Sequence, residues 1–352
     1  MKLMKLLFVF VLIANVQAYT SENKTQHKNK GRKMGNNSSI LTNKPSFNLR
    51  IKCNSARVLI HLNGVEQFNS KRVAPVSLDL PVNDLITSGE NKLEVLMLGV
   101  GTLPIDAQCN VTLFVRKFGD FDSPEQDILT VSYQHDQKEK LAGSTTIGKY
   151  SSLNSFKKDK DGDVEVSIVS VDTFKNMPLS GSDGVVVSAE FSLPTPFPRW
   201  KFLDAPKVLN KIYYSLTIQE AKQLQKENSQ LKKLYSLNHR IYNAAKNKDI
   251  DTLISFFSER NREMDIAYFK VKGDTEKELR AEFKKDMEDK EQALREITES
   301  AWEQHKSTFV VEYGNTLAYL KAILVWNSIG YSGSASYNIK FRYDGEKWIL
   351  TR

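Results

Sequence analysis

The chain has 352 residues, of which 26% are charged and 40% are hydrophobic, so it is long and apolar enough for two folded domains and is not a disordered protein. Its formal net charge is +8, but nine basic residues and one acidic residue fall within positions 1–50, which leaves the rest of the chain neutral. A basic surface that would bind nucleic acid is therefore not expected.

Residues 1–18 are typical of a secretory signal peptide. Lys2 and Lys5 form a basic start, Leu6–Ala14 is an unbroken apolar run, and Val16-Gln17-Ala18 after it is a small-x-small pattern. Cleavage is expected between Ala18 and Tyr19, which places the protein in the periplasm or outside the cell. The apolar run is too short to span a bilayer, which takes about 20 residues, and no transmembrane segment is expected in the mature chain.

Residues 19–46 have the composition of a disordered basic tail, rich in Asn, Lys, Ser and Gly. Two interpretations stay open: a tether to anionic envelope lipid or polysaccharide, and a solvated spacer. Asn23, Asn37 and Asn110 each begin a glycosylation acceptor triplet, which matters in a eukaryotic secretory route.

Residues 47–193 show the period-two alternation of β-strands, separated by turn residues every 8–20 positions. The Asn63-Gly64 dipeptide is typical of a tight hairpin turn. This pattern predicts an antiparallel β-sandwich. Strands are expected at 58–62, 76–80, 93–98, 111–115, 128–133, 164–171 and 185–191.

One stretch of this region resembles the galactose-binding-like jelly-roll modules attached to many glycoside hydrolases. The resemblance rests on Leu62-Asn63-Gly64, on Leu78-Asp-Leu, and on the run from Leu85 to Val95 that contains Gly89 and Asn91. It covers about 40 residues, implies a sandwich and favours sugar binding. Gly89 and Asn91 are expected to turn the chain into the next strand, so the resemblance supplies no ligand residue.

The two cysteines, Cys53 and Cys109, are expected to form one disulfide, because the compartment is oxidising and the count is even. The alternatives are two free thiols or a redox pair, although the Cys-x-x-Cys spacing of redox motifs is missing.

Residues 194–206 form a proline-rich connector with prolines at 194, 196, 198 and 206. We expect Trp200 and Phe202 to pack the connector onto one domain, with a ligand-stacking tryptophan as the alternative.

Residues 207–352 predict a helix-rich α+β domain that ends in an antiparallel sheet. Leu224, Leu231, Leu234, Ile241 and Ala245 form an apolar stripe, which favours a helical hairpin over a coiled coil. A second helix is expected at 249–271, and a third from Thr275, capped through Glu278, to His305, with an exposed middle or a break at the charged run 288–291.

Strands are predicted at 309–313, 317–326 and 334–342, followed by a hairpin through Asp344-Gly345. Helices followed by a closing hairpin resemble the cone-shaped domains related to nuclear transport factor. The helical part, about 100 residues, is longer than that fold usually uses. The resemblance supplies no chemistry, since such folds host enzymes, binders and scaffolds alike.

The sequence contains no recognisable catalytic, metal or cofactor motif. The five histidines lack zinc spacing. The acidic runs at Asp159–Asp163 and Asp120–Asp127 could ligate calcium, but solvated loops are the plainer interpretation. If the C-terminal domain has an acid–base pocket, the candidate residues are Asp265, His305 and Glu312. The alternative interpretation is that these three are ordinary charged residues of the surface.

The prediction is therefore a secreted or periplasmic, non-catalytic binding protein for a glycan or an envelope protein, without a cofactor. Two alternatives remain: an enzyme with its pocket in the C-terminal domain, and an assembly or scaffold protein that uses the apolar stripe. A homodimer is compatible with the same pattern.

Overall fold

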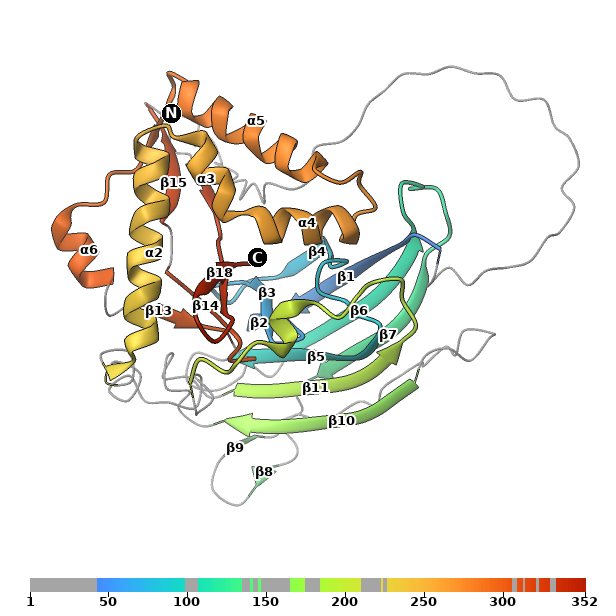
Figure 1. Cartoon of the computed structure of the whole chain (residues 1–352). Coiled ribbons are helices and arrows are strands. Elements are labelled where there is room, and N and C mark those ends of the chain that lie inside the picture. Colours follow the sequence, from blue (N-terminus) through green and yellow to red (C-terminus); the bar gives the residue numbers. More distant parts are fainter. Residues whose placement is uncertain are drawn as a thin grey trace, which may run out of the picture.

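The computed structural model describes residues 43–98, 107–134, 140–141, 145–146, 165–174, 184–209, 223, 227–305, 309–312, 314–320, 323–329 and 334–352. The protein is an α+β fold in which antiparallel sheets come first, helices follow, and further antiparallel strands complete the described chain (Figure 1). This is the fold class that the sequence predicted. The expected cleavage site at Ala18 and Tyr19 lies outside the described residues.

Two antiparallel sheets make the N-terminal β-sandwich. Sheet A has four strands in the order β4-β1-β6-β7, and sheet B has five in the order β10-β11-β5-β2-β3. The strands of these sheets are β1 (Pro45–Asn54), β2 (Arg57–Leu62), β3 (Val65–Asn69), β4 (Val76–Pro81), β5 (Gly89–Leu98), β6 (Gln108–Lys117), β7 (Gln126–Gln134), β10 (Glu165–Phe174) and β11 (Gly184–Leu193). A separate short pair joins β8 (Lys140–Leu141) and β9 (Thr145–Thr146).

The sandwich core forms where the inward positions of both sheets meet. In β6 the alternate residues Val111, Leu113 and Val115 are fully buried, whereas Thr112 is half-buried and Asn110, just before Val111, is exposed. Strand geometry causes this pattern, because successive side chains point to opposite faces of a sheet. The inward residues of β5 and β11, including Val95 and Val187, close the core from sheet B.

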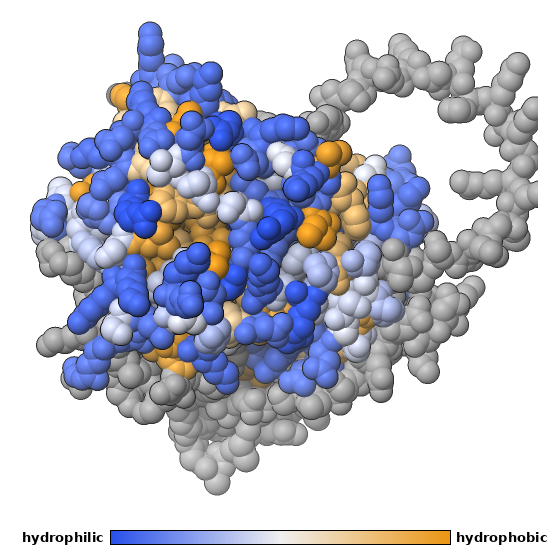
Figure 2. Space-filling model, viewed as in Figure 1, coloured by the Kyte–Doolittle hydropathy of each residue, from blue (hydrophilic) through white to orange (hydrophobic). Residues whose placement is uncertain are grey.

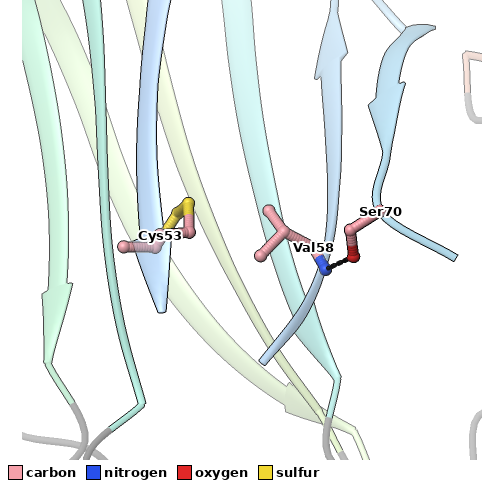
Figure 3. The surroundings of a disulfide bond; sticks show 4 residues. Cys53, Val58 and Ser70 are labelled. Atoms are coloured by element: carbon pink, nitrogen blue, oxygen red, sulfur yellow. Dashed lines mark hydrogen bonds between the residues drawn. A yellow bond between two sulfur atoms is a disulfide. The ribbon is translucent and has the colours of Figure 1, made fainter. Parts of the chain in front are cut away.

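The predicted disulfide joins the two strands at the centre of sheet A. Cys53 on β1 and Cys109 on β6 are direct register partners, and their sulfurs are bonded (Figure 3). Both cysteines are buried in the sandwich core. Beside them in Figure 3, the Val58 N–H donates a hydrogen bond to Ser70 Oγ at 2.9 Å, which fixes the start of β2 to the residue after β3.

The connector packs into the sandwich, as predicted. Trp200 and Phe202 belong to the sandwich core and are 1% and 0% exposed. The Trp200 indole N–H donates to the Ile86 carbonyl at 2.8 Å. A tryptophan this deeply buried cannot stack on a ligand, so that alternative is wrong. The short helix η1 (Lys201–Asp204) follows it.

The C-terminal part combines helices with two small antiparallel sheets, of order β12-β15-β16 and β13-β14-β17-β18. In Figure 1 the helices lie to one side of the sandwich, with α4 beside β4 and β1. The elements are α2 (Ser229–Lys246), α3 (Ile250–Phe256), α4 (Ser258–Ala267), α5 (Asp274–Glu288), β12 (Gln292–Leu294), α6 (Glu299–His305), β13 (Phe309–Val311), β14 (Leu317–Leu320), β15 (Leu324–Ser328), β16 (Ser334–Tyr337), β17 (Phe341–Tyr343) and β18 (Trp348–Leu350).

The apolar stripe of α2 is buried within the chain itself. Leu231, Leu234, Ile241 and Ala245 pack in the core of the C-terminal part, so these residues are not free to hold a partner helix. Leu224, the first residue of the predicted stripe, lies outside the described residues. Asn228 caps the helix by accepting the N–H groups of Gln230 and Leu231.

The predicted helix boundaries needed correction. The helix expected at 249–271 is two helices that meet at Phe257, and the helix expected at 275–305 ends at Glu288. The charged run 288–291 marks that break, and β12 then pairs with β15. The predicted Thr275 cap is wrong, because Gly273 occupies the N-cap position of α5.

The last predicted strands are shorter than expected, and the closing hairpin is confirmed. The expected strand 317–326 is two strands, β14 and β15, and the expected strand 334–342 divides into β16 and β17. Strands β17 and β18 pair across the turn at Asp344-Gly345. Gly345 has φ +106°, a conformation that favours glycine.

Candidate functional site

Buried charged side chains of the C-terminal part hold it against the sandwich. Glu312 is 1% exposed, pairs with Lys340 at 2.7 Å between Oε1 and Nζ, and accepts the N–H of Glu66 at 2.9 Å. Lys340 also donates to the carbonyl of Glu66 at 3.0 Å. Glu312, one of the predicted acid–base candidates, therefore holds the β2–β3 hairpin against the C-terminal part.

A second buried ion pair of the C-terminal part joins β17 to α4. Arg342 on β17 donates two hydrogen bonds to the Glu259 carboxylate on α4, at 2.7 and 2.6 Å. Burial acts to raise the pKa of Glu259, but the hydrogen bonds and charge of Arg342 outweigh it and hold the pKa below its usual range. Paired so closely, Glu259 serves to fix α4 against the sheet rather than to exchange protons.

Arg352 extends the junction to the connector. Its guanidinium pairs with Glu263 on α4, donates to the carbonyl of Asp84 at 2.8 Å and lies 4.4 Å from the centre of the Phe202 ring. Asp84 in turn accepts the Tyr268 hydroxyl at 3.0 Å. These contacts connect the sandwich, the connector and α4 with the segment that follows β18.

The two loops at this junction approach backbone to backbone. The hairpin turn at Gly64 lies against Gly314, whose N–H donates to the Gly64 carbonyl at 2.9 Å. A Cβ at Gly64 would lie 2.4 Å from Gly314 Cα, a distance that real Cβ atoms do not show. The predicted hairpin is confirmed, and its tip packs against the C-terminal part at Gly314.

Asp265, the second acid–base candidate, is a structural residue. Its carboxylate accepts the N–H groups of Gly273 at 2.6 Å and Thr275 at 2.9 Å, which takes over the capping of α5. Burial acts to raise its pKa, but these hydrogen bonds hold the pKa below its usual range. The side chain of His305 lies outside the described part of the molecule.

A buried polar row crosses the outer face of sheet B, opposite the sandwich core. His61 on β2 is the register partner of Glu94 on β5, which is the partner of Ser188 on β11. His61 is fully buried, and burial together with the charge of Lys340 lowers its pKa to about 3. The imidazole is therefore neutral at physiological pH.

The outer face of sheet A is open and polar. We call it the sheet A face and define it by its rows, each read in the strand order β4-β1-β6-β7. The rows, which follow from the registers, are Asp79–Arg50–Thr112–Thr130 and Ser77–Lys52–Asn110–Ser132. All eight side chains are exposed or half-buried.

Arg50 is held rigidly at the centre of the sheet A face. It donates two hydrogen bonds to Asp79, at 3.1 and 3.0 Å, and one to Glu125 at 2.9 Å. Its guanidinium also lies 4.4 Å from the centre of the Phe114 ring. In the same row, the hydroxyls of Thr112 on β6 and Thr130 on β7 are 3.0 Å apart.

A second polar group lies between α4, α5 and β16. The Tyr337 hydroxyl donates to Asp286 at 2.7 Å, and burial raises the pKa of Asp286. Burial and the charge of Asp286 also raise the pKa of Glu282, one turn earlier on α5. Arg260 on α4 faces the group; within the described residues its guanidinium makes one hydrogen bond, to Asn261, and no ion pair.

Sequence reasoning missed this group, and the spacing of Glu282 and Asp286 was the sole local sign of it. Arg260 and Tyr337 join the group through tertiary packing.

Neither acidic run that could ligate calcium forms a metal site among the described residues. Asp159–Asp163 lies outside the described residues. In the other acidic run, Asp120 pairs with Lys117 and Glu125 with Arg50. The described part of the chain contains no group of three or more His, Cys, Asp or Glu side chains placed to hold a metal ion.

Comparison of the chain with protein-family models, with curated proteins and with solved structures gives no match. The resemblances to galactose-binding-like modules and to nuclear-transport-factor-like domains therefore rest on the residues quoted for them. Within the described chain, no helix is long and apolar enough to cross a bilayer.

Proposed function

We propose that the protein is a secreted or periplasmic, non-catalytic binding protein whose sheet A face binds a glycan. The observation that carries the proposal is this open polar face with Arg50 fixed at its centre. Glycans present pairs of hydroxyls, which planar polar side chains recognise by hydrogen bonds, and binding is tighter when those side chains are already immobilised.

The compartment has independent support. The leader predicts export, and the disulfide between Cys53 and Cys109 is a bond that persists in oxidising compartments. The galactose-binding-like resemblance adds a reason to test sugars first.

The ligand chemistry follows from the rows of the face. Hydroxyl, amide and charged groups alternate over four strands, which suits a linear oligosaccharide lying across the sheet. Lys52 and Asn110 are exposed, so they can contact a ligand without rearranging the core.

A glycan array probed with the mature protein, followed by calorimetric titration of retained sugars, tests the proposal. The variants are Lys52→Ala and Arg50→Ala, and the matched control is Lys232→Ala, which removes an exposed lysine from α2. Hydrogen bonds to charged groups contribute about 1.5–3 kcal/mol, so each face variant is expected to weaken binding about tenfold or more. The proposal fails if no glycan is retained, or if the face variants bind as tightly as the control.

The group around Asp286 favours a second candidate function, an enzyme that uses acid–base chemistry. A carboxyl with a raised pKa, hydrogen-bonded to a tyrosine, can donate a proton nearer neutral pH than an ordinary aspartate. Screening with chromogenic esters, phosphates and glycosides tests it. An activity that Asp286→Asn abolishes, and that Glu288→Gln on the exposed side of α5 leaves intact, would establish this function in place of the first. The absence of turnover with every substrate class would count against it.

A further inference from the structure

Exposed apolar side chains gather at one corner of the molecule. Five large apolar residues are exposed in the described chain, and three of them lie on the β6–β7 loop, on the α4–α5 loop and at the end of α4. Phe121, between β6 and β7, is 79% exposed; Val271, between α4 and α5, is 72% exposed; and Ile266, at the end of α4, is 44% exposed. We call these three residues the apolar corner. Apolar surface interrupts the hydrophilic surface at the upper right of the coloured part of Figure 2.

The two loops form one fixed surface, because their aromatic residues pack together. The Phe118 ring lies 5.4 Å from the Phe269 ring and 6.4 Å from the Tyr268 ring, measured between centroids. In Figure 1 the two loops lie next to each other at the end of the sandwich where β1 begins. The exposed side chains therefore project from an anchored base.

Basic groups surround the apolar corner. Arg116 lies 4.8 Å from the centre of the Phe121 ring, and Lys117, Lys270 and Lys272 are exposed nearby in sequence. Lys117 is paired with Asp120 and Lys270 with Glu278, and Asp122 adds one negative charge, so Arg116 and Lys272 supply the remaining positive charge of the corner.

The basic N-terminal region joins the fold at this same corner. The Phe118 N–H donates to the Lys44 carbonyl at 2.9 Å, and Pro45 is the register partner of Lys117. Positions 19–44 carry six basic residues and one acidic residue. The stretch of sequence that leads into β1 at this corner therefore carries a net charge of +5, out of +8 for the whole chain.

We propose that the apolar corner docks on an anionic lipid surface. Phe121, Ile266 and Val271 enter the boundary between headgroups and acyl chains, and the basic residues of the corner and of positions 19–44 bind anionic headgroups. Stable peripheral attachment takes such a combination, because apolar insertion and charge attraction are each weak alone. Single side chains at two loop tips suit a lipid surface better than a protein partner, which needs about 800 Å² of buried area on each side.

Vesicle co-sedimentation tests this inference. The protein is purified after secretion, its N-terminus is established by mass spectrometry, and it is mixed with phosphatidylcholine vesicles with and without phosphatidylglycerol. One variant combines Phe121→Ser with Val271→Ser. Its matched control combines Val73→Ser with Ile329→Ser, which removes the other two large apolar residues that are exposed in the described chain. A charge variant replaces Lys24, Lys28, Lys30, Arg32 and Lys33 with Gln.

We expect binding to the anionic vesicles alone, and a loss of binding as salt rises, since salt screens exposed charges. The corner variant is expected to bind about a hundredfold more weakly, because burying each of its two apolar side chains contributes roughly one tenfold step. The control is expected to bind like the unmodified protein, and the charge variant to lose most binding. Equal sedimentation with neutral vesicles, or no difference between corner variant and control, would overturn the inference. The vesicles carry no glycan, so the outcome is independent of glycan binding by the sheet A face.

Discussion

Replacing Gly64 with alanine is expected to separate the sandwich from the C-terminal part. Gly64 has φ +76°, which costs an alanine about 1–2 kcal/mol of strain. The added Cβ would also lie 2.4 Å from the Cα of Gly314, so the two loops must move apart. That movement breaks the Gly314 N–H to Gly64 carbonyl bond and displaces the Glu66 N–H from Glu312.

The expected size of the effect follows from these terms. A neutral hydrogen bond contributes about 0.5–1.5 kcal/mol and one to a charged acceptor about 1.5–3 kcal/mol. With the backbone strain, the Gly64→Ala variant should lose about 3–6 kcal/mol of unfolding free energy. The matched control is Gly119→Ala, because Gly119 has φ +74° and no heavy atom within 4 Å of an added Cβ. The control should lose the strain term alone.

Urea unfolding followed by tryptophan fluorescence measures both variants. Trp200 reports on the sandwich, and Trp302, Trp326 and Trp348 report on the C-terminal part. We expect one transition for the unmodified protein and for Gly119→Ala, and two separate transitions for Gly64→Ala. Equal losses in the two variants would show that the loops do not meet as described, and would refute the reasoning.

Three other predictions concern charge, oxidation and pH. The Glu259→Gln variant should lose about 3–5 kcal/mol of unfolding free energy, because Arg342 is left buried without its ionic partner. Exchanging both residues for apolar ones should lose far less, and thermal unfolding of the two variants distinguishes these outcomes. Replacing Cys53 and Cys109 by Ser should cost about 4 kcal/mol of unfolding free energy in urea, since the bond closes a loop with a separation of 56 residues. His61 takes up its proton at the ordinary pKa of 6.5 when unfolded but near 3 when folded, so stability should fall by about 2.5 kcal/mol between pH 7 and about pH 4.5. A His61→Leu variant that shows the same loss on acidification would contradict this last assignment.

The sandwich was predictable because its strands and turns are indicated by short stretches of sequence. Alternation along β6 indicates which residues face the core, and Asn63-Gly64 indicates a hairpin. The outward polar positions follow from the same alternation. Their grouping into the sheet A face does not, because it depends on the pairing of β1 with β4 and β6, which no local pattern determines.

The C-terminal part was less predictable because tertiary contacts override local preference. Phe257 separates α3 from α4 without a glycine or proline to mark the boundary. Gln292–Leu294 continues a helical pattern but pairs with β15 as a strand. The pairing of Arg342 with Glu259 joins residues 83 positions apart, and spacing along the chain carries no trace of it.

The contacts of Glu66 also bear on aggregation. Strand β3 is an edge of sheet B, and an edge strand presents backbone groups to which a strand of another molecule can pair. At Glu66 the C-terminal part occupies both groups, since Glu312 accepts the N–H and Lys340 donates to the carbonyl. The C-terminal part thus blocks this edge with charged side chains, and a sandwich produced without it would leave β3 open to pair with another copy.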